Sequence, residues 1–269
     1  MSHKKAENDM LPGLLRTLKL PTFAASYAPA DDRARKEDWS YTRYLRELCE
    51  SEIEERRIKR NERLLKASGL PTEKTLATLD KKKLPSKIAK QLDALCGGAF
   101  VEAAENLLLF GGPGKGKTHV AAAIGHELVN RGVAVHFVAT FRLVQRLLVA
   151  KKELALDAEL KRLDRFEVVI LDDIGYVQQD RDEMEVLFTF LAERYERRSV
   201  VITSNLVFSQ WTRIFKDAMT TAAVIDRVVH HATILEFTNP SVRGDTAKQR
   251  RDTDGADDSE QKEASNAEN

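Results

Sequence analysis

Cysteine is scarce in this chain of 269 residues, which carries only Cys49 and Cys96. Their positions match no metal-binding spacing. No apolar stretch approaches the roughly 18 residues of a membrane-spanning helix, and the N-terminus, Met1 to Lys5, lacks the apolar core of a signal peptide. We therefore expect a cytoplasmic protein with reduced thiols and no membrane contact.

An excess of charge of one sign is also missing, because 43 basic residues stand against 42 acidic ones. Global charge therefore says nothing about partners, and any nucleic-acid surface must be local. The hydrophobic content of 42% is sufficient for a core. The length fits one α/β domain with a smaller appendage.

Residues 111–118 fit the phosphate-loop pattern G-x-x-x-x-G-K-S/T, between an apolar run of strand length (106–110) and a run that opens a helix (120–124). Glycines in such a loop let backbone N–H groups turn towards phosphates, and the helix N-terminus adds partial positive charge. The pattern predicts a bound nucleoside triphosphate, with Lys117 on its β and γ phosphates and Thr118 on the Mg²⁺ that bridges them. The predicted nucleotide-binding residues are Gly111, Gly112, Pro113, Gly114, Lys115, Gly116, Lys117, Thr118 and, by position, His119. A histidine there is more often a packing or hydrogen-bonding residue than a catalytic one.

A second apolar strand, 168–171, ends in two carboxylates, Asp172 and Asp173. This is the expected pattern where a buried parallel strand reaches the ligand edge of an α/β sheet. By position Asp172 is a magnesium ligand, and Asp173 is the carboxylate that polarises the attacking water.

Strand and helix patterns alternate from about residue 96 to 242, with further strands predicted at 133–138, 199–203 and 234–237 and helices at 140–152 and 183–197. This alternation predicts an α/β fold with a parallel central sheet flanked by helices. Asn205 ends the strand expected between the phosphate-loop and carboxylate strands. From there its amide would reach the γ-phosphate or the attacking water.

The first 95 residues are rich in charge and read as helical. Pro12 and Pro21 are expected to bound a short amphipathic helix and Pro29 to close the next segment, before a long helix from about Ser40 to Lys66. Late in that helix runs a basic stripe that is a candidate DNA contact: Arg56, Lys59, Arg60, Arg63 and Lys66. A solvated helix face is an equal alternative, because glutamates lie at ion-pairing distance along the helix.

Composition suggests four regions. They are a small all-α N-terminal domain (1–75), a basic linker (76–95), the nucleotide-binding domain (96–243), and an acidic tail (244–269) expected to be disordered.

Several motifs occur in an order that resembles the IstB-like ATPases, the transposition helper proteins of one class of bacterial insertion sequences. They are Gly112–His119, Leu171–Tyr176, Thr203–Asn205 with Phe208, Trp211 and Phe215, Asp226–Ala232, and Ser241–Arg243. The resemblance covers roughly residues 10 to 243.

The resemblance implies a AAA+ phosphate-loop NTPase core, ATP and Mg²⁺ as cofactors, ATP-dependent self-assembly on double-stranded DNA, and recruitment or stimulation of a cognate transposase. It makes Asn205 similar to the sensor residue of that family. The resemblance also makes Arg227 an arginine finger, which reaches the γ-phosphate of the ATP held by a neighbouring subunit. Without the resemblance, the sequence around Arg227 favours an arginine in a surface salt bridge.

Other functions stay open at this point: a loader of a replicative helicase, a phosphate-loop kinase, or an ATP-gated DNA scaffold with little turnover. Asp173 stands where many AAA+ proteins carry glutamate, and the shorter side chain predicts slow hydrolysis. The resemblance to the transposition helpers implies that DNA stimulates it.

Overall fold

The computed structural model describes residues 2–176, 181–206, 210–211 and 218–239. Phe208, Phe215, the segment 241–243 and the tail from residue 244, all named above, lie outside these residues. The chain divides into two compact units, Met1–Arg63 and Leu64–Asn269. Among the described residues no helix is both long and apolar enough to span a bilayer.

The first unit is helical, as expected, but its helices pass through two prolines. Helix α1 (Ser2–Thr17) contains Pro12 and helix α2 (Pro21–Lys36) contains Pro29, whereas Pro21 stands in the first turn of α2. The predicted breaks at Pro12 and Pro29 are therefore wrong. A proline inside a helix removes one backbone hydrogen bond, yet both helices continue past it, and Ala30 beside Pro29 is fully buried.

Helix α3 (Tyr41–Ser68) contributes a carboxylate that holds the start of α2. The N-cap residue of α2, Leu20, makes no capping hydrogen bond with its side chain. Instead, the buried Glu52 of α3 accepts hydrogen bonds from the backbone N–H groups of Thr22 (2.8 Å) and Phe23 (3.2 Å), and it pairs with Arg56. Burial alone raises the pKa of Glu52, but these donors outweigh it and the net shift is downward.

Helix α3 begins and ends where the sequence predicted. The Ser40 hydroxyl accepts from the backbone N–H of Arg43 at 3.2 Å, which is an N-cap contact. At the other end Gly69 has φ +68°, a left-handed conformation that ends a helix readily in glycine.

The second unit is built on a parallel five-stranded sheet with the order β2-β3-β4-β1-β5. The strands are β1 (Asn106–Phe110), β2 (Val135–Ala139), β3 (Val168–Asp172), β4 (Ser199–Ser204) and β5 (Ala232–Glu236). Each lies within two residues of its predicted start. Strand β4 lies between β1 and β3, as expected.

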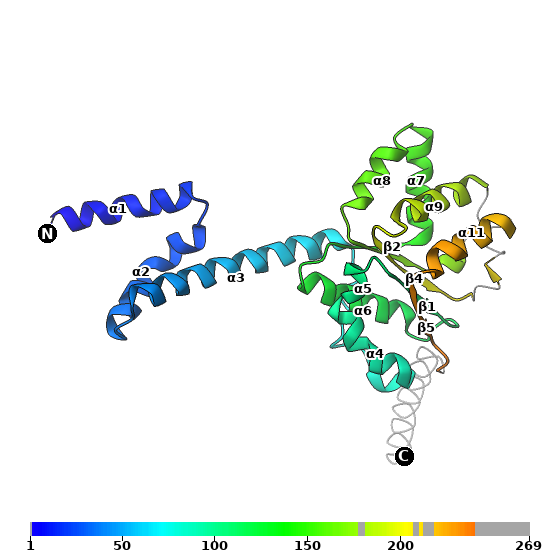
Figure 1. The fold of residues 1–269 in the computed structure, drawn as a ribbon, viewed down its shortest axis with the longest axis horizontal. Helices are drawn as coiled ribbons and strands as arrows, with labels where there is room; N and C mark the ends of the chain where they lie inside the picture. Colours follow the sequence, from blue (N-terminus) through cyan, green and yellow to red (C-terminus); the bar gives the residue numbers. More distant parts are fainter. Residues whose placement is uncertain (1, 177–180, 207–209, 212–217, 240–269) are drawn as a thin grey trace, which may run out of the picture. The chain divides into compact units, whose positions relative to one another are not determined.

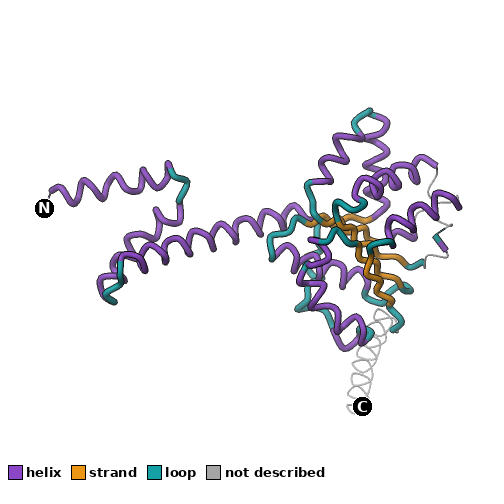
Figure 2. The backbone as a smooth tube through the Cα atoms, in the orientation of Figure 1, coloured by secondary structure: helices purple, strands orange, loops and turns teal. Residues whose placement is uncertain are grey.

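Helices cover both faces of this sheet (Figures 1 and 2). One face carries α4 (Ser86–Gly97), α5 (Ala99–Glu102) and α6 (Lys117–Asn130), and the other carries α7 (Thr140–Lys152), α8 (Leu156–Asp164), α9 (Arg181–Arg194) and α11 (Ala218–Val229). Two 3-10 turns, η1 (Lys81–Lys83) and η2 (Ile174–Tyr176), complete the described elements.

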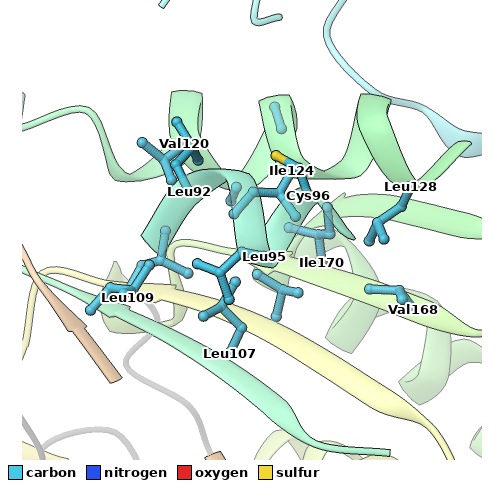
Figure 3. Close-up of a cluster of buried hydrophobic side chains, with 14 of the residues drawn as sticks. Leu92, Leu95, Cys96, Leu107, Leu109, Val120, Ile124, Leu128, Val168 and Ile170 are labelled. Carbon is cyan, nitrogen blue, oxygen red and sulfur yellow. The ribbon is translucent and has the colours of Figure 1, made fainter. Parts of the chain in front are cut away.

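Strand side chains alternate between the two cores, as a doubly covered sheet requires. Leu107 and Leu109 of β1 belong to the core under α4 and α6, while Leu108 and Phe110 belong to the core under α7, α9 and α11. Figure 3 shows the first core, in which Leu92 and Leu95 of α4 face β1.

Residues 76–95, expected to form a basic linker, instead contain part of that core. Ile88 and Leu92 on α4 are fully buried, whereas Lys87 and Lys90 of the same helix are exposed and Lys81–Lys83 form η1 before it. The apolar residues of α4 recur at helical spacing, and the lysines between them masked this face in the sequence.

The edge strand β2 carries a histidine in an unusual environment. The His136 ring stacks on Phe166, with ring centroids 4.8 Å apart. Burial, followed by the nearby Arg146 and Arg162, lowers the pKa of His136 to about 4, against a weaker opposing effect of Glu159. His136 is therefore neutral in the folded protein near pH 7.

Candidate nucleotide-binding site

The phosphate loop and the predicted residues Asp172, Asp173 and Asn205 converge at the carboxyl ends of β1, β4 and β3, which are neighbours in the sheet. The phosphate loop follows β1, Asn205 follows β4, and Asp172 and Asp173 lie at the end of β3. Ligands of open α/β sheets bind at this edge.

Glycine is required in the loop for two different reasons. Gly114 and Gly116 have φ +75° and +98°, which other residues adopt only with strain. At Gly111 a Cβ atom would lie 2.6 Å from the Phe237 carbonyl oxygen, so the close approach of the chain after β5 also excludes a side chain. Asn239 completes this contact by donating from Nδ2 to the Lys115 carbonyl at 3.3 Å.

Lys117 lies at the start of α6 with its ammonium over the loop. Its Nζ donates to the carbonyls of Gly111 (2.6 Å) and Gly112 (2.9 Å), and the residue is only 9% exposed. The loop therefore holds a positive charge at the N-terminus of a helix, an arrangement that favours an anion.

A chain of hydroxyl and carboxylate groups links the loop to β3 and β4. The Thr118 hydroxyl donates to Asp172 Oδ1 at 2.9 Å, and the buried Thr203 hydroxyl donates to the same oxygen at 2.7 Å. Hydroxyl and carboxylate oxygens are the ligands that Mg²⁺ prefers, so the donor set of Thr118 and Asp172 fits this ion.

Asp173 adopts φ +62°, in the left-handed region that aspartate tolerates better than most residues. Its backbone N–H donates to the Thr203 hydroxyl at 2.8 Å. Thr203 thus contacts both carboxylate residues, and sequence reasoning missed it. The strand pairing explains its position, since Leu171 is opposite Ile202 and the next residues are Asp172 and Thr203.

Asn205 lies against η2. A Cβ atom on Gly175 would lie 2.0 Å from Asn205 Oδ1, so the glycine makes room for the amide. This oxygen is buried and has no hydrogen-bond partner among the described residues. A buried acceptor of this kind is suited to a donor such as a water molecule.

Arg227 is not part of this group within one chain. It lies near the end of α11, and the next residue, Val228, accepts at its carbonyl from Asn106 Nδ2 at the amino end of β1 (3.1 Å). The guanidinium carbon lies 4.7 Å from the Phe188 ring centroid. Arg227 is therefore at the edge of the sheet opposite to the phosphate loop.

His119 faces away from the loop. Its Nε2 lies 3.1 Å from the Thr75 carbonyl oxygen and 3.2 Å from the Thr78 hydroxyl. These contacts connect α6 to the segment before α4. The His119 imidazole therefore has a structural role in this chain and does not face the phosphate loop.

The basic stripe of α3 is partly neutralised. Arg56 pairs with Glu52 (2.8 Å) and Lys59 with Glu55 (3.0 Å), and Arg63 donates to the Lys59 carbonyl. These ion pairs favour the solvated-face alternative, although all five basic residues, Lys66 and Arg60 included, remain exposed.

A cavity of about 440 Å³ lies beside the loop, between the start of α4 and the end of β5. Its lining includes Pro85, Ser86, Ile88, Leu235 and Thr238. It is next to the loop, since its lining residue Thr238 lies between Phe237, which closely approaches Gly111, and Asn239, which bonds to Lys115. The sequence contained no signal for this cavity.

The sequence model of the family described as IstB-like ATP binding protein matches residues 13–251. An insertion-sequence ATP-binding protein of Sinorhizobium fredii is 40% identical over 250 residues, which cover 93% of this chain and 84% of that protein. The IS21 ATP-binding protein of Pseudomonas aeruginosa is 36% identical over 230 residues, 86% of this chain and 87% of that protein.

Two solved structures are similar in fold. The crystal structure of DnaI has a TM-score of 0.53 at 23% identity and covers 64% of this chain and 96% of its own. The replication initiator DnaA, bound to AMPPCP and single-stranded DNA, has a TM-score of 0.53 at 14% identity. The match covers 63% of this chain and 51% of the DnaA chain. At this identity the likeness shows the fold alone, and it confirms the expected AAA+ architecture.

Proposed function

Because this chain belongs to the family of IstB-like ATP-binding proteins of insertion sequences, we propose that it is an ATPase that assembles on duplex DNA and recruits or stimulates the partner transposase. The observation that carries the proposal is the joint position of Lys117, Asp172, Asp173 and Asn205 at one sheet edge, with Arg227 at the other.

The triphosphate binds in the loop, where backbone N–H groups and the Lys117 ammonium surround it. The base occupies the cavity between α4 and β5, where Pro85 and Ile234 offer partly exposed apolar surface and Ser86 and Thr238 offer hydrogen-bonding groups. Thr118 and Asp172 would hold Mg²⁺, which neutralises charge on the phosphates when bound.

Hydrolysis depends on Asp173 and Asn205. Asp173 accepts the proton of the attacking water and the Asn205 Oδ1 accepts a hydrogen bond that orients it. The aspartate is one methylene shorter than glutamate, so we expect slow turnover. Assembly on DNA should accelerate it, because assembly brings Arg227 to the neighbouring site.

The position of Arg227 supports a role between subunits. It lies opposite to its own loop, so it reaches a phosphate only in a neighbouring copy. A cation supplied in this way makes hydrolysis depend on assembly.

Two substitutions test the site. Lys117→Ala removes a charge-assisted contact worth about 1.5–3 kcal/mol, so ATP affinity should fall by about 10- to 100-fold. Asp173→Asn keeps a residue that tolerates the left-handed conformation, and should retain ATP and stay on duplex DNA without turnover. Wild-type ATP affinity in Lys117→Ala would refute the nucleotide site.

Mixing two variants tests whether Arg227 acts on the ATP of a neighbouring subunit. Arg227→Ala should bind ATP as the wild type does and fail to hydrolyse it. Mixed with Lys117→Ala it should recover activity, because each variant supplies what the other lacks at a shared interface. Absence of recovery at every mixing ratio would contradict action across subunits.

DNA binding is tested with duplex and single-stranded oligonucleotides of equal length. The proposal predicts ATP-dependent retention of the duplex that weakens steeply with salt. Stimulation of ATP hydrolysis by the single strand alone would contradict it.

A further inference from the structure

Two turns at the amino edge of the sheet bring imidazole and carboxylate groups together. Tyr195 and Glu196 lie in the turn between α9 and β4, and His230 and His231 lie between α11 and β5. Strand β1 separates β4 from β5 in the sheet. The backbone N–H of Asn106, at the start of β1, donates to the His231 carbonyl at 2.7 Å, which fixes the histidine turn against the sheet.

The side chains of this cluster are close to one another. One ligand atom each of Glu196, His230 and His231 lies within 4.8 Å of the others, and His231 Nε2 is 3.7 Å from Glu196 Oε1. The two imidazole rings are 4.3 Å apart between centroids, inclined at 65°. The Tyr195 hydroxyl lies 3.1 Å from Nδ1 of His230.

We propose that Glu196, His230 and His231 form a binding site for Zn²⁺ or a similar transition-metal ion. Two imidazoles and one carboxylate are a donor set that zinc takes in proteins, with a further position for water. Magnesium prefers oxygen ligands, so this site differs in chemistry from the pair Thr118 and Asp172.

The geometry needs only side-chain movement. Zinc bonds of about 2.0–2.1 Å to nitrogen and oxygen place tetrahedral ligand atoms roughly 3.3 Å apart. The side chains of His231 and Glu196 are 50% and 58% exposed, so they have room to close by that amount. The Tyr195 hydroxyl orients the His230 ring, as partners outside the ligand set commonly do.

The site ties together two elements near the arginine of the proposed interface. His230 follows Arg227 by three residues on the same chain segment, and Glu196 follows α9, which carries Phe188 beneath that arginine. A bound ion would join the end of α11 to the end of α9 and restrict both. It would therefore raise thermal stability without nucleotide.

The test uses the full-length protein, free of nucleotide and treated with a chelator, and titrates it with ZnCl₂ by calorimetry. Wild type should bind one equivalent. Glu196→Gln and His231→Ala should each weaken binding by about tenfold or more, since each loses a ligand. Glu193→Gln is the matched control, because this neighbouring glutamate is also exposed and pairs only loosely with Arg197 (3.5 Å).

A second readout identifies the ligands. Co²⁺ in place of zinc should give visible absorption bands of a four-coordinate site in wild type and in Glu193→Gln, and lose them in His230→Ala/His231→Ala. The substituted side chains are on the surface, and urea midpoints without metal verify that each variant is folded. Failure of wild type to bind zinc, or equal binding by the double variant, would overturn the proposal whatever the result of the ATP experiments.

Discussion

The Thr203 hydroxyl is the contact whose removal gives the sharpest test of the site. It donates to Asp172 Oδ1 at 2.7 Å and accepts from the backbone N–H of Asp173 at 2.8 Å, and the residue is 1% exposed. Thr203→Val replaces the hydroxyl by a methyl group of similar size, so it removes both hydrogen bonds and creates no cavity.

The expected loss follows from these two bonds. A hydrogen bond to a charged group contributes about 1.5–3 kcal/mol, and an orphaned buried N–H costs about 1–3 kcal/mol. Asp172 keeps its bond from Thr118, so we expect a total loss of about 3 kcal/mol in the free energy of unfolding. With a slope of about 2–3 kcal/mol per molar urea, the midpoint of the second unit should fall by about 1–1.5 M.

Thr203→Ser is the matched control. It keeps the hydroxyl and loses one methyl group, worth about 1 kcal/mol when buried. Urea unfolding followed by far-UV circular dichroism measures all three proteins, with an unchanged slope expected. The reasoning from hydrogen bonds is refuted if Thr203→Val has the same free energy of unfolding as the wild type, or one no lower than that of Thr203→Ser.

Three further predictions concern other described residues. His136 has a pKa of about 4 when folded, against about 6.5 in the unfolded chain, so stability is complete above about pH 6.5 and is lost as pH falls towards 4. Allowing for the partial exposure of His136, the free energy of unfolding should fall by about 1–2 kcal/mol between pH 7 and pH 5. Urea titrations at both pH values should show a smaller fall for His136→Leu, which has no imidazole to protonate. Gly175→Ala places a Cβ 2.0 Å from Asn205 Oδ1 and should displace that amide, leaving ATP affinity intact and lowering hydrolysis by about tenfold or more; unchanged turnover would contradict a role for the amide. Asn106→Asp turns the donor to the Val228 carbonyl into a buried acceptor, and should cost about 2–4 kcal/mol in urea unfolding at pH 7, less in acid.

Several features of the fold follow from local sequence. The phosphate loop needs glycines at 114 and 116 for left-handed backbone and a lysine at 117, and all of these lie within one short stretch. The limits of α3 follow from Ser40 and Gly69 in the same way. The two prolines misled the prediction because a proline removes only one helix hydrogen bond, and both helices continue past it.

By itself, the sequence determined the family, the nucleotide loop and the strand-helix alternation, because these depend on neighbours along the chain. Tertiary structure decided that Thr203 contacts Asp172, that α4 belongs to the core, and that Glu196 meets His230 and His231. The physical reason is that parallel strands pair across long sequence separations, and their register is set by packing of both sheet faces. Side chains that meet across such a sheet share no pattern that can be read along the chain.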